Sequence, residues 1–183
     1  MIKLKNILNE DDSPKTEKIL MFDSNWKDRG IAAANALYTY GKSIGMTKML
    51  AAAFIGNFAV ESSVRPNVQQ NLTGGMKLGW GFIPTTPDES SKQPEASGYG
   101  LAQWTQTRRA ALIALGAETT NDQLKFVVSE LQGVYKNKWE DIKKSGDLAT
   151  ATSLVAKKYE QAGKPDDSRR IGYAKEIYDS IQD

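Results

Sequence analysis

One carboxylate at the end of an uncharged stretch is the first feature of this sequence that could do chemistry. No charged side chain occurs from Met49 to Val60, and Glu61 follows directly. The stretch is apolar on all sides and too short to span a bilayer, which predicts a buried helix with Glu61 at its inner end. A buried ionised carboxylate is costly, and a partner or a raised pKa relieves that cost. A carboxyl in such a place suits a general acid; the competing interpretation is a helix end neutralised by Arg65.

A second candidate site is the segment Gly98–Trp104, which contains two glycines and places Gln103 beside Trp104. Glycines allow the backbone to approach a ligand closely. An amide can bind sugar hydroxyls, and an indole can stack on the face of a sugar ring. The alternative is a tight turn with a tryptophan in the core.

Other polar residues are weaker candidates. Asn57 lies one turn before Glu61 on the same helical stripe, so it either orients Glu61 or a substrate group or holds the loop that follows. Apolar spacing predicts Tyr159 in the core and Glu160 in solvent. The loop acids are expected to be surface charges, although one of them could be the second carboxylate that an inverting glycosidase requires; they are Asp88, Glu89 and Glu95.

Two absences limit the chemistry further. The 183 residues include no Cys and no His. This excludes Cys–His and Ser–His–Asp catalysis, as well as a zinc site built on thiolate or imidazole. We therefore expect no metal and no cofactor, and a hydrolase of this sequence must use carboxylates, hydroxyls, amides, Lys or Arg.

The composition is that of an ordinary globular domain, with 40% apolar residues and a net charge of +2. Acids and bases are mixed along the chain, unlike the basic stripe of a nucleic-acid-binding protein. No stretch is long enough for a transmembrane helix, and the N-terminus lacks the features of a secretory signal. We expect neither a nucleic-acid partner nor membrane insertion.

The elements that must position these residues are mainly helices, because apolar residues recur at spacings of three and four. The central helix is expected over residues 47–61, with Thr47 as its N-cap. About six more helices surround it, and the last begins at Asp166, Asp167 or Ser168. Residues 76–83 alternate and predict a small β element. Residues 1–24 are interpreted as an extension or strap, and residues 25–183 as the catalytic domain.

Together these residues resemble the phage tail lysozyme family. The resemblance rests on Gly56–Ser62, on Arg65–Asn67 and on Gly98–Trp104 followed by Arg108-Arg109, and it runs from about Trp26 to the end. Their order is also similar to that in goose-type lysozymes and lytic transglycosylases. The resemblance implies a lysozyme-like fold and a peptidoglycan substrate, cut at the β-1,4 link between N-acetylmuramic acid and N-acetylglucosamine.

By this resemblance Glu61 corresponds to the catalytic general acid, and other residues line the cleft. With the candidates above, the expected substrate-binding set is Asn57, Ser62, Gly98, Tyr99, Gly100, Gln103, Trp104 and Tyr159. The leading hypothesis is a phage muramidase; the others are a lytic transglycosylase and a non-catalytic virion or wall-binding module. The expected partners are glycan strands and, through residues 1–24, other tail proteins. The expected location is the phage tail, or the host cytoplasm for a lysis-stage endolysin.

Overall fold

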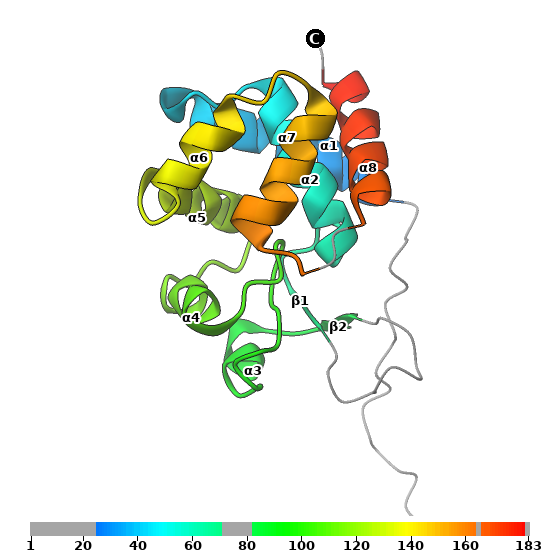
Figure 1. The fold of residues 1–183 in the computed structure, drawn as a ribbon. Helices are drawn as coiled ribbons and strands as arrows, with labels where there is room; N and C mark the ends of the chain where they lie inside the picture. Colours follow the sequence, from blue (N-terminus) through cyan, green and yellow to red (C-terminus); the bar gives the residue numbers. More distant parts are fainter. Residues whose placement is uncertain (1–24, 71–81, 164–165, 182–183) are drawn as a thin grey trace, which may run out of the picture.

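The computed structural model describes residues 25–70, 82–163 and 166–181, and this part of the chain is mainly helical (Figure 1). The predicted mainly helical, lysozyme-like class is confirmed. In chain order the elements are α1 (Trp26–Gly41), the short 3-10 helix η1 (Lys42–Ile44), α2 (Lys48–Ser62), β1 (Val68–Gln70), β2 (Phe82–Pro84), α3 (Pro87–Ser91), α4 (Gln106–Ala114), α5 (Thr120–Gln132), α6 (Lys136–Lys143), α7 (Leu148–Leu154), the π-helical η3 (Val155–Glu160) and α8 (Asp167–Ser180).

The central helix α2 forms where the sequence predicts it. The Thr47 hydroxyl accepts a hydrogen bond from the Leu50 amide at 3.2 Å and caps its N-terminus. All residues from Leu50 to Ala59 are buried. The helix packs against α1, α7 and α8, which surround it in Figure 1. It ends because Ser63 takes the left-handed conformation, with a φ of 54°.

Helix α8 lies unusually close to α2 because of a glycine. A Cβ atom at Gly56 would lie 2.6 Å from the Cβ of Ala174 and 2.7 Å from the backbone oxygen of Arg170. Only a residue without a side chain permits that approach. The contact brings the side chain of Arg170 to the C-terminal end of α2.

The smaller part of the molecule contains β1, β2, α3 and α4, which lie together below the main helical group in Figure 1. The strands are antiparallel, with Val68 opposite Pro84. The β element predicted at 76–83 therefore overlaps β2 at residues 82 and 83, and its remainder lies outside the described residues, as does the 1–24 extension. Helix α3 was not predicted; Thr86 and Glu89 start it with a capping box.

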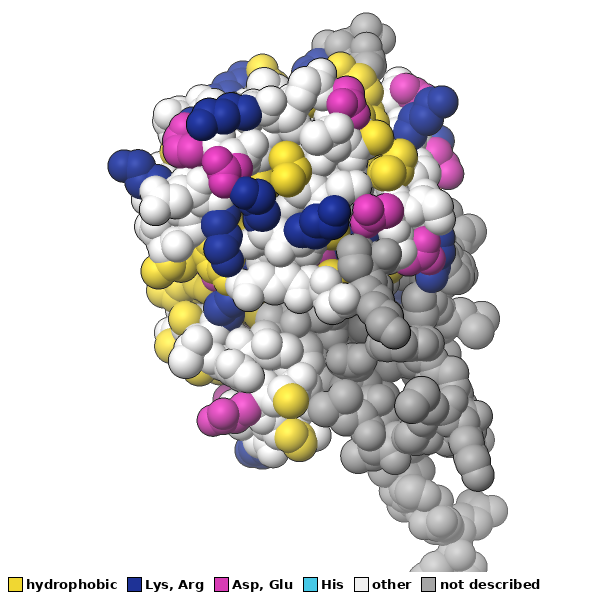
Figure 2. Space-filling view, in the orientation of Figure 1, with side chains coloured by type: hydrophobic (Ala, Val, Ile, Leu, Met, Phe, Trp, Pro, Cys, Tyr) yellow, Lys and Arg dark blue, Asp and Glu magenta, His cyan; other side chains and the backbone are white. Residues whose placement is uncertain are grey.

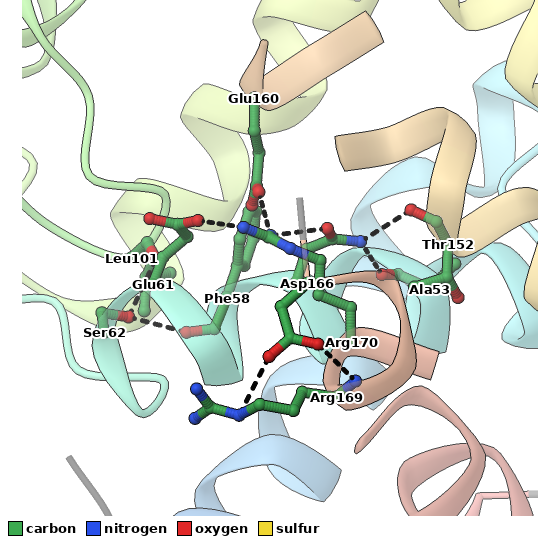
Figure 3. A network of polar contacts seen from close by, with 11 residues as sticks. Ala53, Phe58, Glu61, Ser62, Leu101, Thr152, Glu160, Asp166, Arg169 and Arg170 are labelled. Atoms are coloured by element: carbon green, nitrogen blue, oxygen red, sulfur yellow. Dashed lines mark hydrogen bonds and ion pairs between the residues drawn. The ribbon is translucent and has the colours of Figure 1, made fainter. Parts of the chain in front are cut away.

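One predicted helix near the C-terminus is irregular. The sequence predicts a single helix from Asp147 through Tyr159, but α7 passes into the π-helical segment η3 after Leu154. A wider turn rotates the side chains that follow it relative to a continued α-helix. This change of phase accompanies the inward position of Glu160, whose side chain points toward Arg170 in Figure 3.

The surface is mixed in charge. On the face seen in Figure 2, Lys and Arg side chains are interspersed with Asp and Glu. Within the described residues, the helices fall short of the length and apolar character that a membrane span requires.

Candidate active site

Glu61 lies in the last turn of α2, and its side chain is 26% exposed. Its carboxylate accepts a hydrogen bond from Nη2 of Arg170, which comes from α8, 109 residues later in the chain (Figure 3). The setting of Glu61 is thus not purely apolar, because a buried cation faces it. Among the described residues, the cation that binds the Glu61 carboxylate is Arg170. The competing interpretation assigned this role to Arg65.

Asn57 fixes the position of Arg170. Its side-chain NH2 donates to the backbone oxygens of Ala53 and Thr152 at 2.8 and 3.1 Å. This orientation turns Oδ1 toward Arg170, whose Nη1 donates to it at 2.7 Å. Asn57 is fully buried. Asn57 therefore reaches Glu61 only through Arg170, and its predicted contact with substrate stays a prediction.

Glu160 is the second carboxylate of the cluster. The prediction that it is solvated is wrong, because its side chain is 3% exposed and binds Nη1 of Arg170. Burial, and next the negative charge of Glu61, raise the pKa of Glu160 well above its usual value, and Arg170 opposes them. Its Oε1 atom is buried and has no hydrogen-bond partner among the residues that the structure describes.

The segment after Gly98 is fastened to the tip of α2. The Ser62 hydroxyl lies 2.8 Å from the backbone oxygen of Leu101 and 3.1 Å from that of Phe58, and it can donate to either. Gly100 has a φ of 78°, and its amide donates to the Val68 oxygen at 2.9 Å. The Ser62 hydroxyl and the Gly100 amide therefore hold this backbone beside Glu61.

The side chains of Gln103 and Tyr99 are directed into the protein. The Gln103 NH2 donates to the backbone oxygens of Gly100 and Val68 at 2.9 and 3.2 Å. Its Oε1 lies 2.8 Å from where a Cβ at Gly98 would be, so Gly98 is required for this packing. Tyr99 is 1% exposed, and burial, with the charge of Glu118 second, raises its pKa to about 12. The Gln103 amide thus ties the segment to itself and to Val68, whereas the Tyr99 ring is a member of the core.

Trp104 and Tyr159 are core residues. The indole of Trp104 is 1% exposed, packs against the ring of Phe58, and donates to Glu130 at 3.2 Å. The Tyr159 hydroxyl donates to the same carboxylate at 2.6 Å. Neither ring has a free face on which a sugar could stack, so the position of Trp104 matches the alternative of a core tryptophan.

A comparison with known families decides the relationship. A family model described as phage tail lysozyme matches residues 32–181. The chain belongs to the phage tail lysozyme family. Membership indicates a phage enzyme that degrades peptidoglycan. Neither a curated protein nor a solved structure matches the chain.

The loop acids are at the surface. Asp88, Glu89 and Glu95 are all exposed. Glu89 Oε2 accepts from the Thr86 amide at 2.8 Å, and that bond lowers the pKa of Glu89. No hydrogen bond joins these three to Glu61 in the described part of the chain, and residues 71–81 contain neither Asp nor Glu.

Sequence reasoning missed several residues of this lysozyme site. They are Arg170 as the partner of Glu61, Glu160 as the second carboxylate that Arg170 binds, Glu130 as the acceptor for Trp104, and Gln123, whose Oε1 accepts from the Leu101 amide at 2.9 Å. The sequence contains one indication of the role of Arg170. A buried carboxylate needs a cation, and Arg170 lies next to the apolar Ile171 in an amphipathic stretch, where a cation can face the core. No group of acidic side chains suited to a metal ion occurs among the described residues.

Proposed function

We propose that this phage tail lysozyme is a muramidase in which Glu61 is the general acid. The observation that supports it most is the placement of a partly exposed carboxyl at the end of a rigid buried helix, held by a buried arginine. In its protonated form Glu61 gives a proton to the glycosidic oxygen as the bond breaks. An oxocarbenium-like centre develops at the sugar, and water completes the hydrolysis. The substrate is the β-1,4 link between N-acetylmuramic acid and N-acetylglucosamine.

The decisive test replaces Glu61 with Gln, which keeps the size of the side chain and removes its proton. We expect the rate of clearing of a peptidoglycan suspension to fall by about 10²–10⁴-fold, the usual contribution of a general acid. The matched control is Glu176→Gln on α8, a half-exposed carboxylate far from Arg170 in helical position. Near wild-type clearing by Glu61→Gln would overturn the assignment.

A muramidase also needs a base that activates water, and the candidates for it are Asp88, Glu89 and Glu95. Each is exposed, so its conservative amide variant should fold normally. A variant that loses about 100-fold or more in rate, with an unchanged melting temperature, identifies the base. If all three retain full activity, the hydrolytic mechanism needs another carboxylate.

Lytic transglycosylase activity is the second candidate, and one observation favours it. The other carboxylate bound into the Glu61 cluster, Glu160, is buried and binds Arg170 rather than facing solvent. In a transglycosylase Glu61 alone acts as acid and then as base toward the muramic 6-hydroxyl. Mass spectrometry of released muropeptides separates the two, because anhydro products are lighter by one water.

A non-catalytic wall-binding module is the contrasting outcome. Pelleting with purified peptidoglycan without release of reducing ends or anhydro products would replace the enzymatic proposal. We further propose that the protein is a component of the phage tail, with residues 1–24 contacting other tail proteins. Detection in purified virions would support this placement, and detection only in lysing cells would favour an endolysin.

A further inference from the structure

We propose that Glu160 is a positioning residue for the reaction: by competing with Glu61 for the guanidinium of Arg170, it keeps one proton in the cluster and available to Glu61 through neutral pH. The inference rests on the proposed role of Glu61 as general acid. Glu160 itself is too buried to touch a sugar, so it acts through Arg170.

The geometry places one cation between two carboxylates. Arg170 donates through Nη2 to Glu61 and through Nη1 to Glu160, and its own side chain is 5% exposed (Figure 3). With both carboxylates ionised the cluster carries a net charge of −1, and with one proton it is neutral. Where water is largely excluded, the neutral arrangement is favoured.

The charges around the cluster do not remove this excess. Arg108 faces Glu160 from α4, but its Nε and Nη2 atoms donate to the two carboxylate oxygens of Glu130, at 2.7 and 2.8 Å. At the start of α8, Asp166 and Arg169 face each other at 3.8 Å, so they add no net charge. With Arg108 and Glu130 included, the cluster contains three carboxylates and two guanidinium groups, so one negative charge remains in excess.

The two carboxyls differ in burial, which decides how they share the proton. Glu160 is nearly without solvent, whereas Glu61 is partly exposed. Loss of hydration therefore favours the proton on Glu160 at rest, and the unpartnered Oε1 of Glu160 can carry it. While the pair holds one proton, the fraction of molecules with that proton on Glu61 is set by the two carboxyl environments and does not change with pH.

This sharing predicts a pH profile that a lone carboxyl would not give. In Glu160→Gln, Glu61 is the one carboxyl that still binds the guanidinium, so the cluster has no second group with which to share and retain a proton. We expect wild-type kcat/KM on soluble peptidoglycan fragments to stay level across neutral pH. Over the same range the Glu160→Gln variant should fall about tenfold per pH unit.

A purely structural role for Glu160 gives a different result. It lowers kcat/KM by the same factor at every pH, and that outcome would overturn the inference. Glu176→Gln serves as control and should keep the wild-type profile. Circular dichroism checks that the Glu160→Gln variant is folded.

A second measurement does not depend on turnover, so it tests the inference even if a variant is inactive or unfolded. In ¹³C NMR of Glu-labelled wild-type protein, with Glu61→Gln used for assignment, we expect the pair to retain one proton at pH 7. Full ionisation of both carboxyls at pH 7 would overturn the inference whatever the activity. Conversely, a retained proton in a protein that cleaves no peptidoglycan would reject the proposed function and leave the shared proton established.

Discussion

Two buried arginine–glutamate networks lie on either side of Tyr159–Glu160 in this molecule, and they are built differently. In the first, Glu130 accepts two hydrogen bonds from Arg108, and its Oε2 also accepts from the Tyr159 hydroxyl at 2.6 Å and from the Trp104 indole at 3.2 Å. One cation meets one carboxylate, and both carboxylate oxygens have partners. The network is electrically balanced, and its carboxylate is fully hydrogen-bonded.

The second network uses the same residue types without that balance. Arg170 donates to both Glu61 and Glu160. Within the described part of the chain, two buried atoms of this network, Oε1 of Glu160 and Nε of Arg170, lack hydrogen-bond partners. A satisfied pair stabilises one arrangement, whereas an unbalanced one can hold or release a proton. This difference fits the proposed roles, in which the Arg108 network supports the fold and the Arg170 network supports the chemistry.

The largest effect on stability should come from breaking the balanced network. Glu130→Ala leaves Arg108 as an uncompensated, mostly buried charge and removes the acceptor for Trp104 and Tyr159. We expect the free energy of unfolding, measured with urea, to fall by about 3–5 kcal/mol. Glu160→Gln should cost clearly less, because Arg170 keeps Glu61. Equal losses in the two variants would refute the contrast between the networks.

The next effect concerns the helix contact that delivers Arg170. Gly56→Ala places a methyl group 2.6 Å from atoms of Ala174 and should reduce stability by about 1–3 kcal/mol, the usual cost of overpacking. It should also lower activity, since α8 must move away from Glu61. Gly172→Ala on α8 is the control: nothing lies within 4 Å of its added Cβ, and stability should be unchanged or rise by up to about 1 kcal/mol. Similar behaviour of the two variants would mean that the close approach is unimportant.

A smaller effect is the dependence of stability on pH. Because burial raises the pKa of Glu160, the folded protein binds more protons than the unfolded chain at any pH above the ordinary value of about 4.3 and below the raised one. Stability therefore falls as pH rises through this range, by at most about 1.4 kcal/mol per pH unit for one proton. Urea titrations at pH 5.5, 6.5 and 7.5 should show this decline in the wild type and a flatter response in Glu160→Gln. A wild-type stability that rises over this range would contradict the assignment.

The smallest effect is expected from an ion pair outside both networks. Lys158 belongs to η3 and bonds to Asp141 at the surface. Solvent screens such pairs, so Asp141→Asn should lower the melting temperature by no more than about 2 °C. A larger drop would show that the surface pair helps to hold η3 and with it Glu160.

The parts of this site that follow from local sequence were predictable. The uncharged run through Val60 and the cap at Thr47 predict α2, and the position of Glu61 at the end of that run is enough to single it out. Trp104 was ambiguous because composition does not tell whether an indole beside glycines faces a groove or the core. Its burial depends on Phe58 and Glu130, which come from other helices.

The remaining parts depend on contacts between distant segments. Nothing near Glu61 in the sequence indicates that its partner is Arg170, because the approach of α8 depends on Gly56 and on the packing of the whole domain. The apolar spacing around Glu160 is that of an ordinary α-helix, and this spacing predicts that Glu160 faces solvent. The π-helical turn at Val155–Glu160 changes that phase, and spacing alone does not reveal it.

The distance along the chain between Glu61 and Arg170 also sets an order of events during synthesis. A ribosome has already made the central helix when more than a hundred residues remain before the arginine. A nascent or truncated chain that stops before α8 carries the acid but not the group that holds it. If Glu61 acts as proposed, its site is complete only once α8 has left the ribosome.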